Sequence, residues 1–321
     1  DLIATLVTAG AAAPVTGNGN VELTTTTSGS IYLGSVTADE DLVVVNAEEA
    51  IDDDVDIYHE DGIDILANTV NLDADTGIGA VNAIEMAQVD VIDADTIDND
   101  IDLDNAADAT VTVNSMTVAV GNDGDIRYDQ TGNQQLWLMR VATPDGDVTI
   151  TNAGGKNATV IVNGVPGLPG VQADLIDDTV TVIADGSIAA LANDANPEIT
   201  AATINLTAKN NGIGVGNRFD VNAVVALNAD TTNDNGVIII NDVVGDLPAG
   251  LINAGTGNVT LSASDAILEA AATDAAADVI GGVLDLYGPA GVGSVTEPLE
   301  IDAQISLFAT ALYLGADVVL S

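Results

Sequence analysis

Two runs of aspartate are the part of this chain whose residue type and spacing best suit metal binding. They comprise Asp52, Asp54 and Asp56 in the first run, and Asp98, Asp100, Asp102 and Asp104 in the second. The acids of the second run alternate with other residues, so a strand would place all four carboxylates on one face, ~6.5–7 Å apart. Hard oxygen ligands at this density suit Ca²⁺. The pattern favours a solvated acidic face neutralised by diffuse counterions, and weak Ca²⁺ binding by these residues is the alternative interpretation.

Neither run belongs to a known calcium loop, because the chain has no Gly-Gly-x-Gly-x-Asp nonapeptide and no helix-loop-helix calcium motif. Paired carboxylates also serve glycosidases, which hold two of them at a set separation in a cleft. Acids occur along the whole chain and aromatic residues are scarce, so no such pair stands out. We therefore expect no catalytic residues and no required cofactor. A carbohydrate-active β-helix enzyme remains the alternative.

His59 and Trp137 are the only residues of their types. One histidine cannot complete a zinc site or a catalytic triad without distant partners, so an ordinary turn histidine among acids is the simpler interpretation of His59. Trp137 suits either an interface anchor or a filler of the protein interior. Neither residue defines a site.

The formal charge of −45 comes from 50 acidic and five basic side chains. This charge repels phosphate backbones and anionic lipids, so we expect no nucleic-acid binding and no electrostatic adhesion to membranes. Counterions or divalent cations should stabilise a fold that repels itself so strongly. The chain has no cysteine and no run of ~18 apolar residues, so we also expect no disulfide, no thiolate metal site and no membrane span.

The elements that must position these residues are short strands that recur in similar patterns. A Gly-apolar-Gly step appears three times, as Gly77-Ile78-Gly79, Gly212-Ile213-Gly214 and Gly291-Val292-Gly293. An alternating strand phrase precedes each copy, at residues 19–23, 146–150 and 257–261. Smaller markers repeat about once per coil: Gly124 precedes Gly146 by 22 residues (146 − 124), and Gly236 precedes Gly257 by 21 (257 − 236). Self-similarity at this period is typical of stacked solenoid coils.

We therefore predict an all-β, single-stranded parallel β-helix (β-solenoid) of about 15 coils, at ~21 residues a coil. The apolar side chains are nearly all Val, Ile, Leu and Ala, which suit a narrow interior. Predicted strands include residues 30–33, 42–45, 55–58, 110–113, 159–162, 179–183 and 237–240. We expect one continuous solenoid over residues 1–321, with sub-blocks at about 1–122, 123–235 and 236–321. Tandem antiparallel β-sandwich domains are the alternative, because regular turn spacing fits them too.

The segment from Gly257 to Asp302 resembles the repeats of filamentous-haemagglutinin-like exoproteins of the two-partner-secretion type. The resemblance is carried by Gly-Asn-Val-Thr-Leu-Ser-Ala-Ser-Asp-Ala-Ile-Leu, then Gly-Gly-Val-Leu-Asp-Leu, Gly-Val-Gly-Ser and Pro-Leu-Glu-Ile-Asp. It covers the last ~65 residues best. Its motifs encode coil geometry rather than a site. It implies a right-handed parallel β-helix and a structural role at a bacterial surface.

Apolar strands at both extremities predict uncapped solenoid ends, because open β edges invite pairing with another chain. The end residues are Leu2, Ile3, Leu6, Leu314, Val318, Val319 and Leu320. We expect a non-enzymatic extracellular or cell-surface protein, a fibre subunit or adhesin stalk. It would stack head-to-tail or form part of a longer polypeptide, with a cell-surface or polysaccharide ligand as a further possible partner. A calcium-dependent adhesin is the other alternative.

Overall fold

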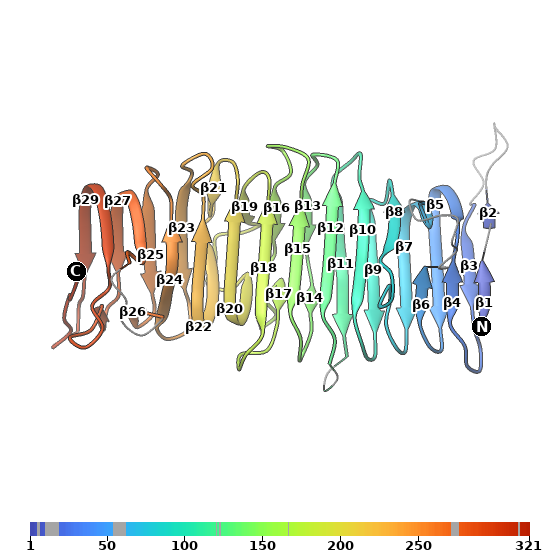
Figure 1. Cartoon of the computed structure of the whole chain (residues 1–321), viewed down its shortest axis with the longest axis horizontal. Coiled ribbons are helices and arrows are strands. Elements are labelled where there is room, and N and C mark those ends of the chain that lie inside the picture. Colours follow the sequence, from blue (N-terminus) through green and yellow to red (C-terminus); the bar gives the residue numbers. More distant parts are fainter. Residues whose placement is uncertain are drawn as a thin grey trace. The chain divides into compact units, whose positions relative to one another are not determined.

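A computed structural model describes residues 1–4, 7–9, 19–53, 62–119, 121, 123–165, 167–270, 276–313 and 315–321. The chain forms two compact units, Asp1–Ala153 and Gly154–Ser321. Each unit is built from β-strands and connecting turns, and no helix occurs among the described residues. The strands form a parallel β-solenoid of about 12 turns in total (Figure 1).

Among its described residues the first unit has fifteen short to medium strands, most of which alternate buried and half-exposed side chains. They are β1 (Leu2–Ala4), β2 (Val7–Ala9), β3 (Val21–Thr24), β4 (Ile31–Leu33), β5 (Val36–Ala47), β6 (Ile51–Asp53), β7 (Ile65–Ala74), β8 (Ile84–Ala87), β9 (Val91–Thr96), β10 (Ile101–Ala106), β11 (Val111–Val118), β12 (Ile126–Thr131), β13 (Leu136–Leu138), β14 (Val141–Ala142) and β15 (Val148–Asn152). The predicted strands at residues 30–33, 42–45 and 110–113 fall within β4, β5 and β11 to within one residue. The predicted strand at residues 55–58 lies outside the described residues.

The second unit follows the same design. Its strands are β16 (Val160–Val162), β17 (Val171–Gln172), β18 (Thr179–Ala184), β19 (Ile188–Ala190), β20 (Ile199–Ala208), β21 (Gly212–Ile213), β22 (Phe219–Asp230), β23 (Val237–Asp242), β24 (Leu247–Asn253), β25 (Val259–Ala263), β26 (Ala266–Glu269), β27 (Val279–Tyr287), β28 (Gly291–Val292) and β29 (Ile301–Thr310). The remaining predicted strands coincide with β16, β18 and β23.

Neighbouring coils pair in parallel, which confirms the solenoid and shows that the antiparallel sandwich alternative is wrong. In the first unit Val70 of β7 pairs with Ile92 of β9, and Ile92 pairs with Val113 of β11. In the second unit Ile204 of β20 pairs with Leu227 of β22. The strand order in Figure 1 follows this stacking within each unit.

The predicted number of coils, about 15, is higher than the observed number of about 12 turns. A coil between Ile31 and Ile51 has 20 residues (51 − 31), whereas the coil between Val259 and Leu284 has 25 (284 − 259). The turns between strands differ in length, so a period taken from the shortest spacings overestimates the number of coils. The predicted division into three sub-blocks stays a prediction.

The Gly-apolar-Gly step is a corner at which only one or two residues pair with the adjacent coils. Ile78 is fully buried and pairs in parallel with Ile51 on one side and Ile101 on the other. Ile213 takes the same place in the second unit, between Ile188 and Ile238. The central apolar residue therefore continues the interior row of each unit.

The second glycine of this corner is required by backbone geometry. Gly214 has φ +73°, a left-handed conformation that side chains rarely adopt, and a Cβ there would lie 2.1 Å from the carbonyl oxygen of Ile239 in the next coil. Gly79 and Gly293 repeat this arrangement, with φ +67° and +69° and with the carbonyl oxygen of the next coil at 2.3 and 2.0 Å. The second glycine of the repeat is thus explained by the close approach of the backbone of the next coil.

The interior of each unit is lined mainly by fully buried Val, Ile, Leu and Ala side chains. Tyr128 and Phe219 are the largest fully buried side chains. Trp137 is half-exposed on β13, and its Nε1 donates to Oε1 of Gln135 at 3.5 Å, which overturns the interpretation of this residue as an interior filler. Burial of aliphatic area at ~25 cal/mol per Å² is the main source of stability in such a stack.

Candidate functional site

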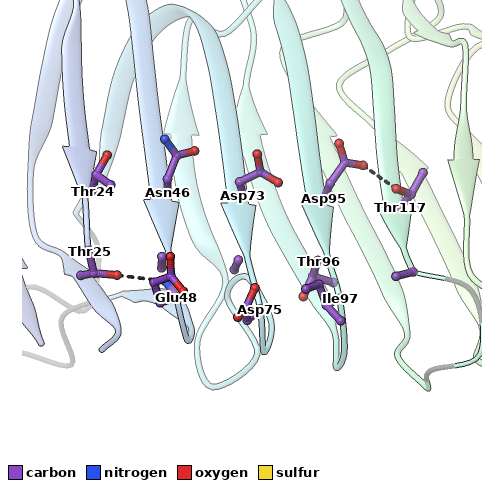
Figure 2. Close-up of a pocket in the computed structure, with 13 residues that line it drawn as sticks. Thr24, Thr25, Asn46, Glu48, Asp73, Asp75, Asp95, Thr96, Ile97 and Thr117 are labelled. Atoms are coloured by element: carbon purple, nitrogen blue, oxygen red, sulfur yellow. Dashed lines mark hydrogen bonds between the residues drawn. The ribbon is translucent and has the colours of Figure 1, made fainter. Parts of the chain in front are cut away.

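A groove of about 450 Å³ crosses five strands of the first unit, β3, β5, β7, β9 and β11. Figure 2 shows its floor, a row of polar side chains that stand in register on neighbouring strands. The row consists of Thr24, Asn46, Asp73, Asp95 and Thr117. Glu48 and Asp75 add carboxylates from the adjacent turns. The thirteen lining residues include no lysine, arginine or histidine, so the groove offers no cationic group to a ligand.

Asp73 and Asp95 are neighbouring carboxylates on the strands of this groove. Burial raises the pKa of Asp73 above its usual value, and the negative charges of Asp95 and Asp75 raise it further. Asp95 accepts hydrogen bonds from the hydroxyl groups of Ser115, at 2.8 Å, and Thr117. Neighbouring strands stand ~4.8 Å apart, which sets the spacing of the row. The groove can attract cations and accept hydrogen bonds.

A second acidic surface lies on β10 and β12 of the same unit. Arg127 bridges Asp102, at 3.4 Å, and Asp129. Burial raises the pKa of Asp102 and of Asp104, while the positive charge of Arg127 lowers both. A hollow of about 260 Å³ next to Arg127 adds further acids from turns of adjacent coils. One arginine thus partly compensates a crowded set of carboxylates.

The second predicted aspartate run is divided between a turn and a strand. Asp102 and Asp104 point outward from β10, whereas Asp98 and Asp100 precede its first residue, Ile101. The expectation that all four carboxylates share one strand face is therefore wrong. The turn uses these acids locally: Asp98 Oδ1 accepts the N–H of Asn99, and Asp100 Oδ1 accepts a backbone N–H of the next coil at 2.9 Å. Calcium binding by the run stays a prediction.

The first predicted run is described only in part. Asp52 is 6% exposed, its Oδ1 accepts the N–H of Val81 at 3.2 Å, and burial raises its pKa. Through this hydrogen bond Asp52 stabilises the turn that follows the Gly-Ile-Gly corner of the next coil. Asp54 and Asp56 lie outside the described residues, and so does His59.

Two other groups of three acids are close enough for their carboxylate oxygens to share a cation. In each group one oxygen from every residue lies within 4.8 Å of the others; the groups are Asp174, Asp177 and Asp178, and Glu269, Asp278 and Glu300. Burial, and then contact with Glu300, raises the pKa of Asp278 to about 6. Sequence reasoning missed both groups. The first is visible as a local Asp-x-x-Asp-Asp, but the second joins residues from separate coils.

Four nearly buried acids were also missed, because composition made the acids look like surface residues. Asp64, Glu198, Asp220 and Asp242 are at most 3% exposed. Burial raises the pKa of Asp64 to about 9, that of Glu198 to about 8 and that of Asp242 to about 7. A local signal does exist for three of them: Asp64, Glu198 and Asp220 each come directly before an apolar residue within or at the start of a strand.

The predicted end residues are partly or well exposed where they are described. Leu2 and Ile3 are 37% and 65% exposed on β1 of the first unit. In the second unit Val318 is 44% exposed and bridges to Val292, while Leu320 is half-exposed and bridges to Leu299. Val319 is half-buried, and Leu6 and Leu314 lie outside the described residues.

Comparison of the chain with protein-family models, with curated proteins and with solved structures gave no match. The fold agrees with a β-helix repeat protein at the level of architecture. Within the described residues, no helix has the length and apolar character needed to cross a membrane.

Proposed function

We propose that this protein is a non-enzymatic, extracellular structural protein, a fibre subunit or adhesin stalk of the filamentous-haemagglutinin-like kind. Support comes from the parallel solenoid, which places most of its residues in scaffold rather than in a catalytic cleft. The grooves of the described region carry oxygen ligands spread along a sheet and no convergent acid–base pair. A charge of −45 keeps such a scaffold soluble and hydrated at a surface.

The observation that carries this proposal is the open edge at β29. Leu284 and Val279 of β27 are fully buried, whereas their partners one coil later, Leu307 and Ile301, are only half-buried. Beside them Phe308 is 60% exposed. An exposed, apolar edge strand readily pairs with a strand of another chain through its unpaired backbone groups.

The occupant we assign to this edge is a β coil of a second copy of the protein. The exposed residues Leu2 and Ile3 of β1 offer an apolar strand edge of matching character. A contact between two different surfaces of identical subunits does not close on itself in general and produces filaments. Rigidity and a strongly acidic surface are then the working properties of the assembly.

Sedimentation velocity and negative-stain microscopy across a concentration series test this assignment. We expect species larger than the monomer that grow with concentration and elongate in one direction. The double variant Ile305→Glu and Phe308→Glu places charge at the edge on residues that are 74% and 60% exposed, so the coil should still fold. We expect this variant to stay monomeric.

The matched control is Val295→Glu, which adds charge at a loop residue that is 78% exposed. It should assemble like the wild type, apart from the small effect of one added charge. A wild-type protein that remains monomeric at every concentration, or a control that loses assembly as completely as the edge variant, would contradict the proposal.

Calcium-dependent adhesion is a second candidate, favoured by the three-carboxylate group of Glu269, Asp278 and Glu300. Asp and Glu oxygens converging at this distance suit Ca²⁺. We expect millimolar Ca²⁺ to raise the melting temperature, and Asp278→Asn to reduce that rise. A melting temperature that neither Ca²⁺ nor EGTA changes would exclude this candidate.

A further inference from the structure

One corner of the solenoid stacks acidic side chains of adjacent coils against each other. In the second unit Glu198, which precedes β20, donates its N–H to the carbonyl of Asp220 at 2.7 Å. Asp220 in turn donates its N–H to Oε2 of Glu198 at 2.6 Å. The two residues are 2% and 1% exposed. Reciprocal backbone and side-chain contacts therefore hold two acids together in the interior.

The first unit repeats this corner with different residues. Asp64, which precedes β7, donates its N–H to the carbonyl of Glu85 at 2.8 Å. Glu85 donates its N–H to Oδ2 of Asp64 at 3.0 Å. Asp64 is 3% exposed. The same backbone pairing, carried by an acid directly before the interior apolar residue, thus occurs in both units.

The charged groups around these corners are mostly negative. Glu198 faces Asp220 and Asp194, and the cation nearby, Arg218, is held by both oxygens of Asp220 at 2.6 and 3.0 Å. On the opposite side of Glu198 its carbonyl accepts the N–H of Val171, which carries no charge.

Asp64 faces Glu85 on one side and Asp53 on the other, and its carbonyl accepts the N–H of Val36. Within the part of the chain that the structure describes, Asp64 forms no ion pair with a lysine or an arginine. An ionised carboxylate at either corner would therefore be desolvated and repelled by its neighbours.

We propose that Glu198 and Asp64 keep their protons in the folded protein and that the two corners make the solenoid a structure that loosens in alkaline solution. The protonated form removes the repulsion between stacked acids and leaves a carbonyl oxygen to accept the N–H of the next coil. Loss of the proton puts like charges side by side in a dry interior. The response is built into the scaffold and is independent of the proposed end-to-end assembly.

The sign of the pH dependence follows from the pKa values. Burial is the main cause that raises the pKa of Glu198 to about 8 and that of Asp64 to about 9. The folded state therefore binds more protons than the unfolded state between the ordinary carboxyl value of about 4 and these values, and stability falls as the pH rises through that window. The stability contributed by the two protonated acids is fully present below about pH 4 and is lost above about pH 9.

In the upper part of this pH window, titration of the two corner acids can be distinguished from titration of the many ordinary carboxylates. Ordinary carboxylates are already ionised at about pH 6, and lysine and arginine keep their charge to about pH 9.5. A loss of stability from pH 6 to pH 9.5 therefore reports on acids with raised pKa values, and these include Asp242 next to Asp246.

Thermal unfolding of the full chain at constant ionic strength, from about pH 6 to pH 9.5, tests the proposal. We expect the wild-type melting temperature to fall across this range. Glu198→Gln keeps the accepting oxygen and removes the charge, so it should raise the melting temperature already at pH 6, and by roughly 3 °C or more beyond that at pH 9.5. Asp64→Asn should behave in the same way in the first unit.

Asp265→Asn and Asp123→Asn are the matched controls, because each removes one negative charge from a turn position in the corresponding unit. We expect them to shift the melting temperature equally at both pH values. A wild-type melting temperature that is flat from pH 6 to 9.5, or controls that reproduce the gain of Glu198→Gln and Asp64→Asn, would overturn the proposal. The sloping pH profile should persist in 1 M NaCl, since buried pairs are screened little; a profile abolished by salt would also contradict it.

Discussion

Both units stack polar side chains in the interior of a narrow solenoid, but a row in the first unit and a row in the second are built from different residue types. In the first unit a row of amides, Asn105, Gln130 and Asn152, stacks in register in the interior. In the second unit the buried polar residues of consecutive coils are the carboxylic acids Glu198, Asp220 and Asp242. Amides carry no charge at any ordinary pH, whereas acids do, so the amide row of the first unit is indifferent to pH, while the acid row of the second unit, like the Asp64 corner of the first, depends on pH.

The amide row is linked by hydrogen bonds between coils. Gln130 Nε2 donates to Oδ1 of Asn152 at 3.3 Å, and its Oε1 accepts the hydroxyl of Tyr128 at 3.1 Å. That hydroxyl accepts a hydrogen bond from Nδ2 of Asn105 at 3.3 Å. The links in this row join neutral amide and hydroxyl groups, so they need no change of protonation state.

The acid row satisfies itself through backbone donors. Asp242 accepts the N–H groups of Ala223, at 3.1 Å, and Val244, at 2.9 Å. Asn241 also donates its Nδ2 to Asp220 at 3.0 Å. Donors of this kind stabilise the charged form, and burial opposes them, so the balance depends on pH. The same backbone arrangement therefore accommodates either buried amides or buried acids between its coils.

The largest effect we predict comes from removing what the two units share, the tight glycine corner. Gly214→Ala combines an unfavourable left-handed φ with a Cβ 2.1 Å from the Ile239 carbonyl, and we expect a loss of about 3 kcal/mol or more. Urea denaturation at pH 6 and pH 9 checks it. The loss should be the same at both values because no charge is involved.

Gly216→Ala is the matched control for this corner. It has φ +92°, and a Cβ there would meet only open space, so only the backbone cost of about 1–2 kcal/mol should appear. Equal losses in the two variants would show that the close approach between coils does not contribute.

An intermediate effect is expected from breaking the amide row. Gln130→Leu removes a donor to Asn152 and an acceptor for Tyr128, which leaves buried polar groups short of partners and costs about 2–4 kcal/mol. Denaturant unfolding at pH 6 and pH 9 should give the same loss. A loss that grows at pH 9 would contradict the division of the interior into pH-indifferent and pH-dependent parts.

The fold was predictable from sequence because coil geometry is local. The Gly-apolar-Gly corner and the alternating strands at Val148, Val180 and Val259 can be read directly as turns and buried faces, and the structure has them as expected. The number of coils was overestimated because loop length varies from coil to coil, and the alternation around Ile101 was extended too far back into a turn.

The buried acids could not be predicted in the same way. In a chain with 50 acidic residues, Asp64 and Glu198 resemble any other turn acid, and their burial depends on the residue that lies above them in the next coil. Register between coils is a property of the stacked structure, since one inserted loop residue changes which acids meet. The second three-carboxylate group was hidden for the same reason.

The smallest predicted effect concerns an exposed acid whose pKa moves in the opposite direction. A hydrogen bond from Lys209, at 2.7 Å, lowers the pKa of Asp185. Its contribution to stability is therefore present above the ordinary carboxyl pKa and lost as the pH falls through the folded value. Because Lys209 is 47% exposed, Lys209→Met should cost at most about 1 kcal/mol at pH 7, and less at pH 3, in urea denaturation.

The central claim, that the stacked corners hold neutral acids, is tested most directly by carbon-13 NMR titration of the side-chain carboxyl groups. Resonances that vanish in Glu198→Gln and Asp64→Asn identify the two residues in the folded wild type. We predict titration midpoints of about 8 for Glu198 and about 9 for Asp64. Midpoints near the ordinary value of about 4 for both residues would contradict the account.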